Sequence, residues 1–341
     1  MDRRVVRKRP RTSIEGGANH FLAPSKSLDF IKSGCTLLDL VLGGGWPLGR
    51  ISNIVGDKST GKTLLAIEAC ANFVRDYPRA RIWYAEGEAA FDKDYAEALG
   101  MPVKKVKFSE PNTVEEFEDH LKRQIAWCNE TGRPGLYILD SLDSLSDDKE
   151  MNLERGKNSY GTSKAKELSQ MFRKLIRDVK KSNIHVMIIS QVRDNIGVSF
   201  GRKTKRSGGK ALDFYASQVL YLAHTGEIVR RRKGQKRVVA VKVKAKCDKN
   251  KVGLARRDCE FTIRFGYGVD DIRASLDFLG QTKELKRADI ESRSAADKLL
   301  EELDSIDNAT YRGIARAVKS AVRQVWEQTE RDFLPKRRKY G

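Results

Sequence analysis

A glycine-rich stretch that ends in lysine and threonine carries the residue types best suited to chemistry in this sequence. It fits the phosphate-loop pattern G-x-x-x-x-G-K-[ST], and its members are Gly56, Asp57, Lys58, Ser59, Thr60, Gly61, Lys62 and Thr63. The glycines allow consecutive backbone N–H groups to face a phosphate. Lys62 would contact the β- and γ-phosphates, and the Thr63 hydroxyl would be a ligand of Mg²⁺. The pattern predicts a site for a nucleoside triphosphate.

The segments on either side of this loop have the pattern that would position it. Residues Ile51–Val55 have the composition of a short buried strand, and residues Thr63–Cys70 that of a helix with one apolar face. A helix N-terminus directly after the loop would add positive potential at the phosphates. The alternative is a chance match in a glycine-rich turn, which residue frequencies allow in roughly one chain in a hundred. The strand–loop–helix context makes that alternative rarer still.

Three further polar side chains follow apolar strands, where they would reach the same edge of a sheet. Asp140 ends the apolar run Leu136–Asp140, the placement of a Walker B carboxylate that orients Mg²⁺. Glu88, like Glu86, comes just after the strand Arg81–Ala85, where a carboxylate could polarise the attacking water. Gln191 follows the next central strand and could contact the γ-phosphate through its amide. Taken singly, each of them could equally be a surface residue near a turn.

From Ile51 onward, strand and helix patterns alternate. This order predicts an α/β fold with a twisted, mostly parallel sheet covered by helices on both faces. Helices are expected at Asp92–Leu99, from Thr113, and at Ser163–Lys181. The other expected strands are Val103–Phe108, His185–Ser190, Val219–Ala223, Val238–Ala245 and Phe261–Phe265.

The chain divides by composition into three parts. Residues 1–27 form a short basic N-terminal arm and oligomerisation segment, which we expect to order on DNA or on a neighbouring subunit. Residues 28–270 form the α/β core. Residues 271–341 have only helical patterns and end in a basic tail, Lys336–Lys339.

Net charge is the strongest global feature of the 341 residues. The formal charge is +20, and the pI is about 9.7. Nucleic acid is the expected polyanionic partner; an anionic membrane surface and a merely solvated basic surface are the alternatives. No apolar run is long enough to span a membrane, and the N-terminus has no secretory signal. The five cysteines form no C-x-x-C pair, so we expect reduced thiols in a cytoplasmic protein.

Over roughly Leu28 to Val269 the chain resembles the RecA family of ATP-dependent DNA recombinases. The order and spacing of several stretches are more specific than the phosphate loop alone. They are Gly49–Ile51, Glu86–Asp92 with Tyr95-Ala96, Leu139–Leu142, Ser169–Leu175, Gln191–Gly197, Gly208–Ser217 and Lys249–Lys251. The resemblance implies a RecA-like P-loop NTPase core that binds ATP and Mg²⁺.

Residue by residue, the resemblance also implies roles in catalysis. Glu88 matches the carboxylate that activates water, while Asp92 and Tyr95 match the adenine contacts. Gln191 matches the switch that reports the γ-phosphate to the DNA-binding loop. Lys249 and Lys251 match lysines that cap the ATP of the adjacent protomer, which places the complete site at a subunit interface. With Lys62 and Asp140, Glu88 and Gln191 form the predicted catalytic set.

Two loops would line the DNA channel, at about residues 151–162 and 192–210. They are rich in cations and glycine, as suits a phosphate backbone, and Phe200 is the one ring in the second loop. The predicted DNA-binding residues are Arg155, Lys157, Arg193, Arg202, Lys203, Lys205, Arg206, Gly208, Gly209 and Lys210.

The leading hypothesis is a DNA-dependent ATPase that forms filaments on single-stranded DNA and promotes homologous pairing and strand exchange with duplex DNA. The alternatives are a ring-forming motor, such as a helicase with the same core, and a non-catalytic ATP-binding accessory of recombination. The chain departs from the bacterial pattern in its short basic N-terminus and its basic rather than acidic C-terminus. Both departures favour a divergent or phage-encoded recombinase, which would then work in the host cytoplasm.

Overall fold

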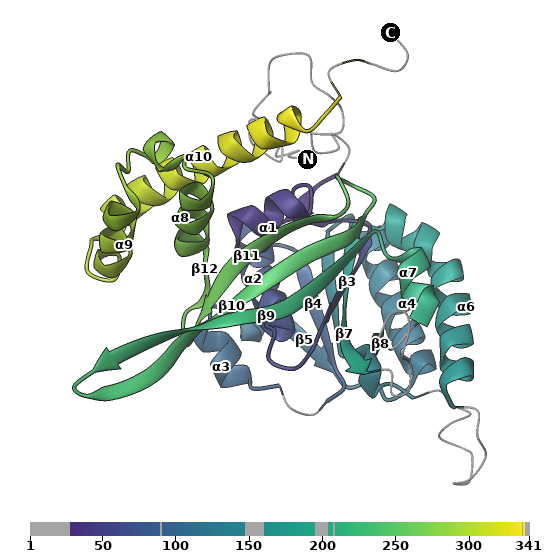
Figure 1. Cartoon of the computed structure of the whole chain (residues 1–341). Coiled ribbons are helices and arrows are strands. Elements are labelled where there is room, and N and C mark those ends of the chain that lie inside the picture. The colour runs from purple at the N-terminus through teal and green to yellow at the C-terminus, as the bar shows by residue number, and fades with distance from the viewer. Residues whose placement is uncertain are drawn as a thin grey trace, which may run out of the picture.

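A large mixed sheet forms the centre of the molecule (Figure 1). The structure, a computed structural model, describes residues 28–88, 91–146, 160–194, 204–206, 209–335 and 337. Within these residues the sheet has ten strands. Nine of them follow the order β12-β11-β10-β9-β3-β7-β6-β4-β5, and β8 pairs with β7. The predicted α/β fold with a mostly parallel sheet is confirmed.

The parallel half of the sheet brings the predicted site residues to one edge. Its central strands are fully buried and almost wholly apolar, as expected when helices cover both faces. In register, Glu86 lies opposite Asp140, and Gly56 lies opposite Gln191. The strands are β3 (Ile51–Gly56), β4 (Arg81–Glu86), β5 (Val106–Ser109), β6 (Gly135–Asp140), β7 (Ile184–Asp194) and β9 (Gln218–Arg232).

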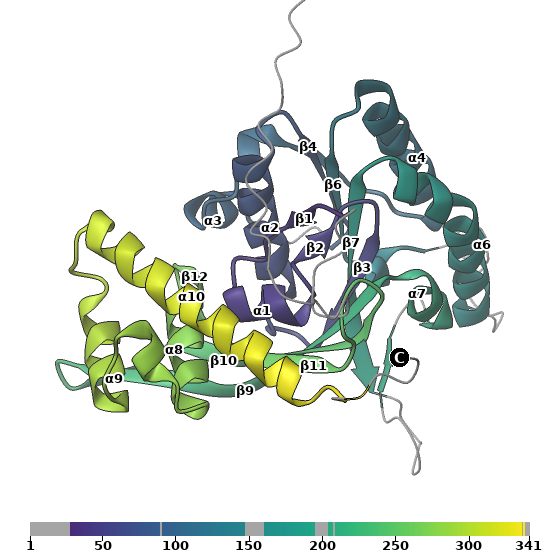
Figure 2. The same cartoon turned by 90° about the horizontal axis from the view of Figure 1, so that it is seen from above.

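Helices pack on both faces of this sheet (Figure 2). The first core cluster joins α1 (Thr36–Val41) and α2 (Lys62–Asp76) to one face. The second joins α4 (Val114–Thr131), α6 (Tyr160–Lys181) and α7 (Gly209–Tyr215) to the other. The Thr113 hydroxyl caps α4 by accepting a hydrogen bond from Glu116 N–H at 3.2 Å.

The antiparallel half is longer than the sequence predicts. Strands β9 and β10 (Gln235–Asn250) pair along almost their whole length, and their ends project beyond the sheet (Figure 1). The predicted strands Val219–Ala223 and Val238–Ala245 cover only their inner parts. Half of the residues between them are charged, and they lack the apolar alternation of a half-buried strand. Strands β11 (Arg257–Arg264) and β12 (Gly268–Asp270) complete the sheet.

The shorter elements differ only locally from expectation. The predicted strand Val103–Phe108 is wrong in its first half, because Val103–Lys105 forms the 3₁₀ turn η1 before β5 begins. A separate pair, β1 (Phe30–Ile31) and β2 (Trp46–Pro47), contacts α2 through β1. The 3₁₀ turn η2 (Leu142–Ser144) follows β6. Among the helices that the structure describes, none is long and apolar enough to cross a membrane.

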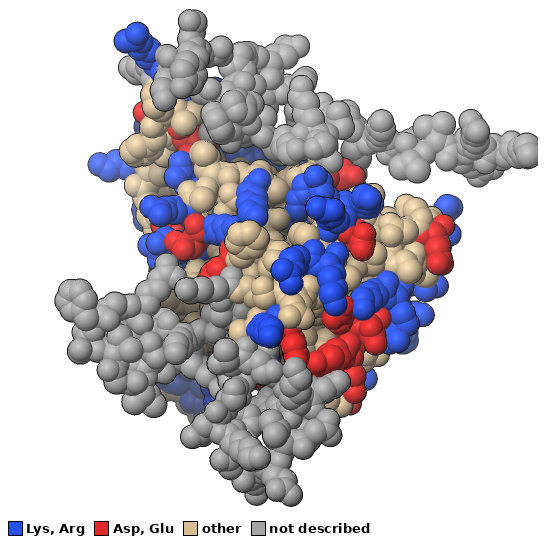
Figure 3. Space-filling model, turned by 90° about the vertical axis from the view of Figure 1, so that its right-hand side faces the viewer, with Lys and Arg blue, Asp and Glu red and all other residues tan. Residues whose placement is uncertain are grey.

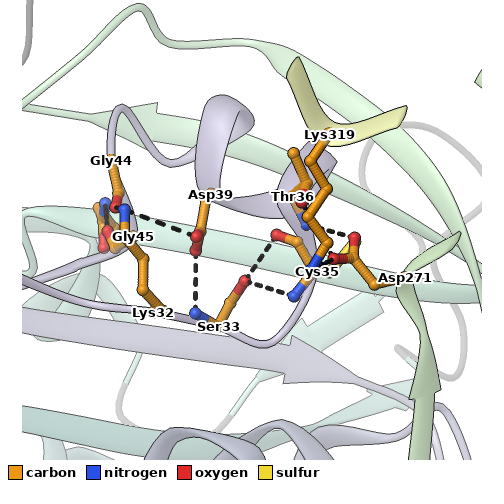
Figure 4. A network of polar contacts seen from close by, with 10 residues as sticks. Lys32, Ser33, Cys35, Thr36, Asp39, Gly44, Gly45, Asp271 and Lys319 are labelled. Carbon is orange, nitrogen blue, oxygen red and sulfur yellow. Dashed lines mark hydrogen bonds and ion pairs between the residues drawn. The ribbon is translucent and has the colours of Figure 1, made fainter. Parts of the chain in front are cut away.

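The C-terminal helices pack onto α1 and β11 and share the first core cluster. Asp271 links the two regions: it accepts hydrogen bonds from Thr36 N at 2.6 Å and Thr36 Oγ1 at 3.0 Å (Figure 4). It also pairs with Lys319 Nζ at 2.7 Å. The elements are α8 (Asp271–Gln281), the 3₁₀ turn η3 (Leu285–Ala288), α9 (Arg293–Glu302) and α10 (Asn308–Asp332).

Candidate functional site

The phosphate loop connects β3 to the N-terminus of α2. Gly61 adopts a left-handed backbone with φ 88°, which a residue without Cβ adopts at little cost, and α2 begins at Lys62. Lys62 is buried, and its Nζ donates to the Asp57 carbonyl at 2.7 Å. Burial lowers the pKa of Lys62, and the carboxylates of Asp140 and Glu88 oppose that shift. This hydrogen bond holds the Lys62 ammonium group beside the N-terminus of α2. A helix N-terminus is a favourable place for a phosphate group.

The candidate Mg²⁺ ligands are in contact with each other. Thr63 Oγ1 donates to Asp140 Oδ2 at 2.8 Å, and Tyr84 OH donates to the same oxygen at 2.7 Å. Burial raises the pKa of Asp140, while the two hydroxyl donors act in the opposite direction. A hydroxyl and a carboxylate at this edge are hard oxygen ligands of the kind that Mg²⁺ prefers. The donor set fits the metal that the sequence predicts.

Tyr84 was missed by sequence analysis. It lies in the middle of β4 with its ring fully buried, so its hydroxyl needs a hydrogen-bond partner inside the protein. The available sequence clue is a tyrosine in an otherwise apolar central strand.

Glu88, the predicted water-activating carboxylate, and Gln191, the predicted γ-phosphate sensor, are in contact. Gln191 Nε2 donates to Glu88 Oε1 at 2.8 Å, and Ser141 Oγ donates to the same oxygen at 2.6 Å. Gln191 is held at its backbone, where its N–H donates to Asp143 Oδ2 at 2.7 Å. Ser141 and Asp143 were not predicted. They follow β6 directly, and only the parallel pairing of β6 with β7 brings them here.

The predicted adenine contacts lie at the start of α3 (Lys93–Ala98). Asp92 caps this helix by accepting the Tyr95 N–H at 2.9 Å, and both side chains are exposed. Tyr95 is 48% exposed and is therefore accessible to a ligand. Glu86, the alternative to Glu88, accepts the Glu88 N–H at 2.9 Å and thereby stabilises the turn after β4.

Lys249 and Lys251 lie level with the beginning of β3, whereas the phosphate loop of their own chain follows the end of β3. Asn250 pairs with Gln218, Gln218 pairs with Ser52, and Ser52 is at the beginning of β3. The loop leaves the other end of β3, four residues further on, which is roughly 13 Å at about 3.3 Å per residue. Both ammonium groups contact the Phe214 carbonyl at the end of α7, at 2.9 Å for Lys249 and 3.4 Å for Lys251. Lys249 also donates to the Asp213 carbonyl.

A family model described as the RecA N-terminal domain matches residues 17–270. The chain belongs to the RecA family. "Protein RecA" from Trichodesmium erythraeum (strain IMS101) is 34% identical over 268 residues, which are 78% of this chain and 71% of that protein. "Protein RecA" from Clostridioides difficile (strain 630) is 33% identical over 267 residues, 78% of this chain and 74% of that protein. "Protein RecA" from Borreliella afzelii (strain PKo) is 36% identical over 256 residues, 74% of this chain and 67% of that protein.

Membership of the RecA family confirms the predicted family and supports DNA recombination and repair as the general function. The DNA-binding residues remain predictions. Arg155, Lys157, Arg202, Lys203 and Gly208 lie outside the described residues. The backbone of β8 (Thr204–Arg206) returns antiparallel along β7, pairing Arg193 with Lys205 and Val192 with Arg206. Gly209 and Lys210 begin α7. The second loop therefore emerges from the strand that carries Gln191.

Proposed function

We propose that this RecA family member is a DNA-dependent ATPase that forms filaments on single-stranded DNA. In this proposal it promotes homologous pairing and strand exchange with duplex DNA, and it acts in the cytoplasm. The contact that carries the proposal is the hydrogen bond from Gln191 to Glu88. It joins the group that would activate water to the strand from which the second DNA loop emerges. A site built in this way can couple ATP turnover to DNA.

In this proposal, the residues around the phosphate loop have separate roles in ATP hydrolysis. Lys62 and the α2 N-terminus would hold the phosphates, and Thr63 and Asp140 would hold Mg²⁺, which would neutralise charge on the phosphate oxygens. Glu88 then polarises the attacking water. The hydrogen bonds from Ser141 and Gln191 to its Oε1 fix the orientation of the carboxylate. A γ-phosphate oxygen could compete with Glu88 for the Gln191 amide, and this exchange would report bound ATP to the loop.

Self-association completes the site in this proposal. Lys249 and Lys251 lie at the end of the strands opposite to their own phosphate loop, which supports a role at the ATP of a neighbouring subunit. A compact ammonium can stabilise charge that develops on the transferred phosphoryl group. Hydrolysis then depends on assembly, and assembly depends on DNA.

Glu88→Gln is the variant that tests the function most directly. It should bind ATP and form filaments on single-stranded DNA, because a general base acts only in the transition state. Its DNA-stimulated turnover should fall by at least about 100-fold. Glu86→Gln is the matched control and should keep most of the parental turnover, because its amide oxygen can still accept the Glu88 N–H.

The measurements are nucleotide binding, ATPase rate with and without single-stranded DNA, and electron microscopy with a non-hydrolysable ATP analogue. If Glu88→Gln hydrolysed ATP at the parental rate, Glu86 would become the candidate for activating the attacking water. Closed rings in place of helical filaments would contradict the recombinase and favour a motor.

A further inference from the structure

The 3₁₀ turn η2 and the serine before it contact both Glu88 and Gln191. Ser141 Oγ donates to Glu88 Oε1 at 2.6 Å, and Asp143 Oδ2 accepts the Gln191 N–H at 2.7 Å. Ser144 Oγ closes the turn by donating to the Ser141 carbonyl at 2.6 Å. A displacement of η2 would therefore move the proposed water-activating carboxylate and the proposed γ-phosphate sensor together.

The turn is also packed tightly against the residue before Glu88. The Gly87 N–H donates to the Asp140 carbonyl at 2.9 Å. A Cβ atom on Gly87 would lie only 2.0 Å from Ser144 Oγ, so there is no space for a side chain between the two segments. Glu88 thus depends on η2 through its neighbouring backbone as well as through its side chain.

A lysine of helix α6 holds this turn in place. Lys164 Nζ donates to the Leu142 carbonyl at 2.9 Å and also to the Leu145 carbonyl. An ammonium group has three N–H donors, so one lysine can satisfy two carbonyls at once, with hydrogen bonds strengthened by its charge. The side chains of Leu142 and Leu145 are buried in the second core cluster, to which α6 belongs. The turn is therefore fixed by apolar packing of its side chains and by Lys164 at its backbone.

Lys164 differs from the cations that follow it on the same helix. Acidic and basic side chains are mixed on the molecular face that carries α4, α6 and α7, so a lysine on α6 is ordinary by itself (Figure 3). Lys164, however, is half-buried, and its ammonium contacts two backbone carbonyls. The later cations of α6 are all exposed: Lys166, Arg173, Lys174, Arg177, Lys180 and Lys181. The contacts of Lys164 favour a specific role at the turn over that of a solvated surface charge.

We propose that Lys164 is a positioning residue for ATP hydrolysis. It holds η2 where Ser141 can orient Glu88 and where Asp143 can hold the backbone of Gln191. The inference rests on the proposed function, which assigns Glu88 and Gln191 to ATP hydrolysis. Without the ammonium group the backbone of η2 is free to shift, and a misplacement of about 1 Å at a catalytic group can lower a rate by roughly 100-fold.

Lys164→Met tests this role, because methionine keeps an apolar stem and removes the ammonium group. With single-stranded DNA present, kcat for ATP should fall by roughly 10- to 100-fold, since a displaced general base weakens only the transition state. ATP affinity and KM should change by less than about twofold, because the proposed phosphate contacts of Lys62 and Thr63 come from a different segment. Rates are expressed per ATP-binding subunit, so that a loss of folded protein is not counted as a loss of turnover.

Two variants control for the charge and for the hydrogen bonds. Lys166→Met removes one charge from an exposed position of the same helix and should keep the parental kcat. Lys164→Arg keeps N–H donors at position 164, so its kcat should fall by less than about threefold. Equal losses in Lys164→Arg and Lys164→Met would contradict a role for the hydrogen bonds.

A double variant tests whether Lys164 acts through η2. Ser141→Ala removes the hydrogen bond from the turn to Glu88 Oε1. If Lys164 and Ser141 act on Glu88 along one path, the double variant should lose much less than the product of the two single losses. Losses that multiply would show independent effects and would overturn the path through η2.

The remaining outcomes separate this inference from the proposed function. A parental kcat in Lys164→Met would overturn the role of Lys164 alone, provided that the parent hydrolyses ATP in response to DNA. A parallel loss of ATP affinity and kcat would also overturn it, because that result marks a general structural role. A parent without DNA-stimulated hydrolysis would overturn the proposed function, and the role of Lys164 with it.

Discussion

Asp140 depends on two hydroxyl donors, and one of them, Tyr84, comes from a neighbouring strand. Tyr84→Phe should keep the buried ring and remove only the hydrogen bond. Because burial already raises the pKa of Asp140, loss of a donor to its charged form should raise that pKa further. In the proposed role Asp140 orients Mg²⁺ only when it is ionised, so the acid limb of the ATPase profile should move to higher pH. Hydrogen bonds to charged groups contribute about 1.5–3 kcal/mol, so the rate on the acid side should fall by roughly tenfold or more.

The measurement is DNA-stimulated ATPase against pH at saturating Mg²⁺. Tyr137→Phe is the matched control, because its hydroxyl contacts His120 at 2.9 Å, away from the candidate site. If the profiles of Tyr84→Phe and the parent superimpose, Tyr84 has only a packing role.

Among single residues, sequence analysis predicted those whose type and spacing form a local motif. It missed residues that reach the site from separate parts of the chain. Lys62 and Thr63 belong to one continuous motif. Tyr84, Ser141 and Asp143 acquire their contacts only through strand pairing, which their own neighbours in sequence do not specify. A buried tyrosine and a serine after a strand are each common in ordinary cores and turns.

Helix α1 contains a carboxyl group whose environment should make stability depend on pH. Burial raises the pKa of Asp39 to about 6, and the nearby Lys32 ammonium, 3.6 Å from Asp39 Oδ2, opposes the shift (Figure 4). The folded state then holds this proton up to about pH 6, while the unfolded chain releases it near 3.8. Between these values the folded state binds more protons, so its stability falls as pH rises.

Asp39→Asn should remove this dependence. Its side-chain oxygen can still accept the Ser33 N–H, which donates to Asp39 Oδ1 at 2.9 Å in the parent. Relative to the parent, the variant should gain on the order of 3 kcal/mol in unfolding free energy between pH 4 and pH 7. Urea unfolding at several pH values measures the difference, with the exposed Asp29→Asn as control. A constant difference between variant and parent across this range would contradict the assignment.

Elements were predictable where burial imposes a simple pattern. The strands β3 and β6 are buried throughout, and their apolar runs identify them almost to the residue. The outer part of the β9–β10 pair has no buried face, so neither apolar alternation nor an apolar run marks it. Its turn contains Lys233-Gly234 in place of the usual Asn-Gly, which removes the strongest local sign of a hairpin.

At the scale of the whole molecule, the predicted ATP-site residues lie at two opposite ends of the strands of the sheet. The phosphate loop and Gln191 lie at one edge of the parallel sheet, and Lys249 and Lys251 lie at the other. The C-terminal helices are attached to the core by ion pairs, including Arg257 to Glu330, whose two hydrogen bonds are each 2.6 Å long. In the filament that we propose, repeating this subunit would bring Lys249 and Lys251 of one copy toward the phosphate loop of the next.

The double variant Lys249→Ala, Lys251→Ala tests this arrangement at the scale of the assembly. As a free subunit it should bind ATP with parental affinity, since neither lysine can reach its own phosphate loop. It should lose DNA-stimulated hydrolysis by at least about 100-fold if the ammonium groups stabilise the transferred phosphoryl group. The exposed pair Lys104→Ala, Lys105→Ala removes the same charge and should hydrolyse ATP at the parental rate.

Mixing the double variant with Lys62→Ala gives the deciding comparison. Lys62→Ala should fail to bind ATP but keeps its lysine cap, whereas the double variant keeps its phosphate loop. At some interfaces of a mixed filament an intact loop then faces an intact cap, so part of the DNA-stimulated ATPase should return, while each variant alone stays inactive. Fluorescence energy transfer between differently labelled variants on single-stranded DNA verifies that the two variants assemble together. Parental hydrolysis by the double variant alone, or no recovery in filaments shown to be mixed, would contradict a site shared between subunits.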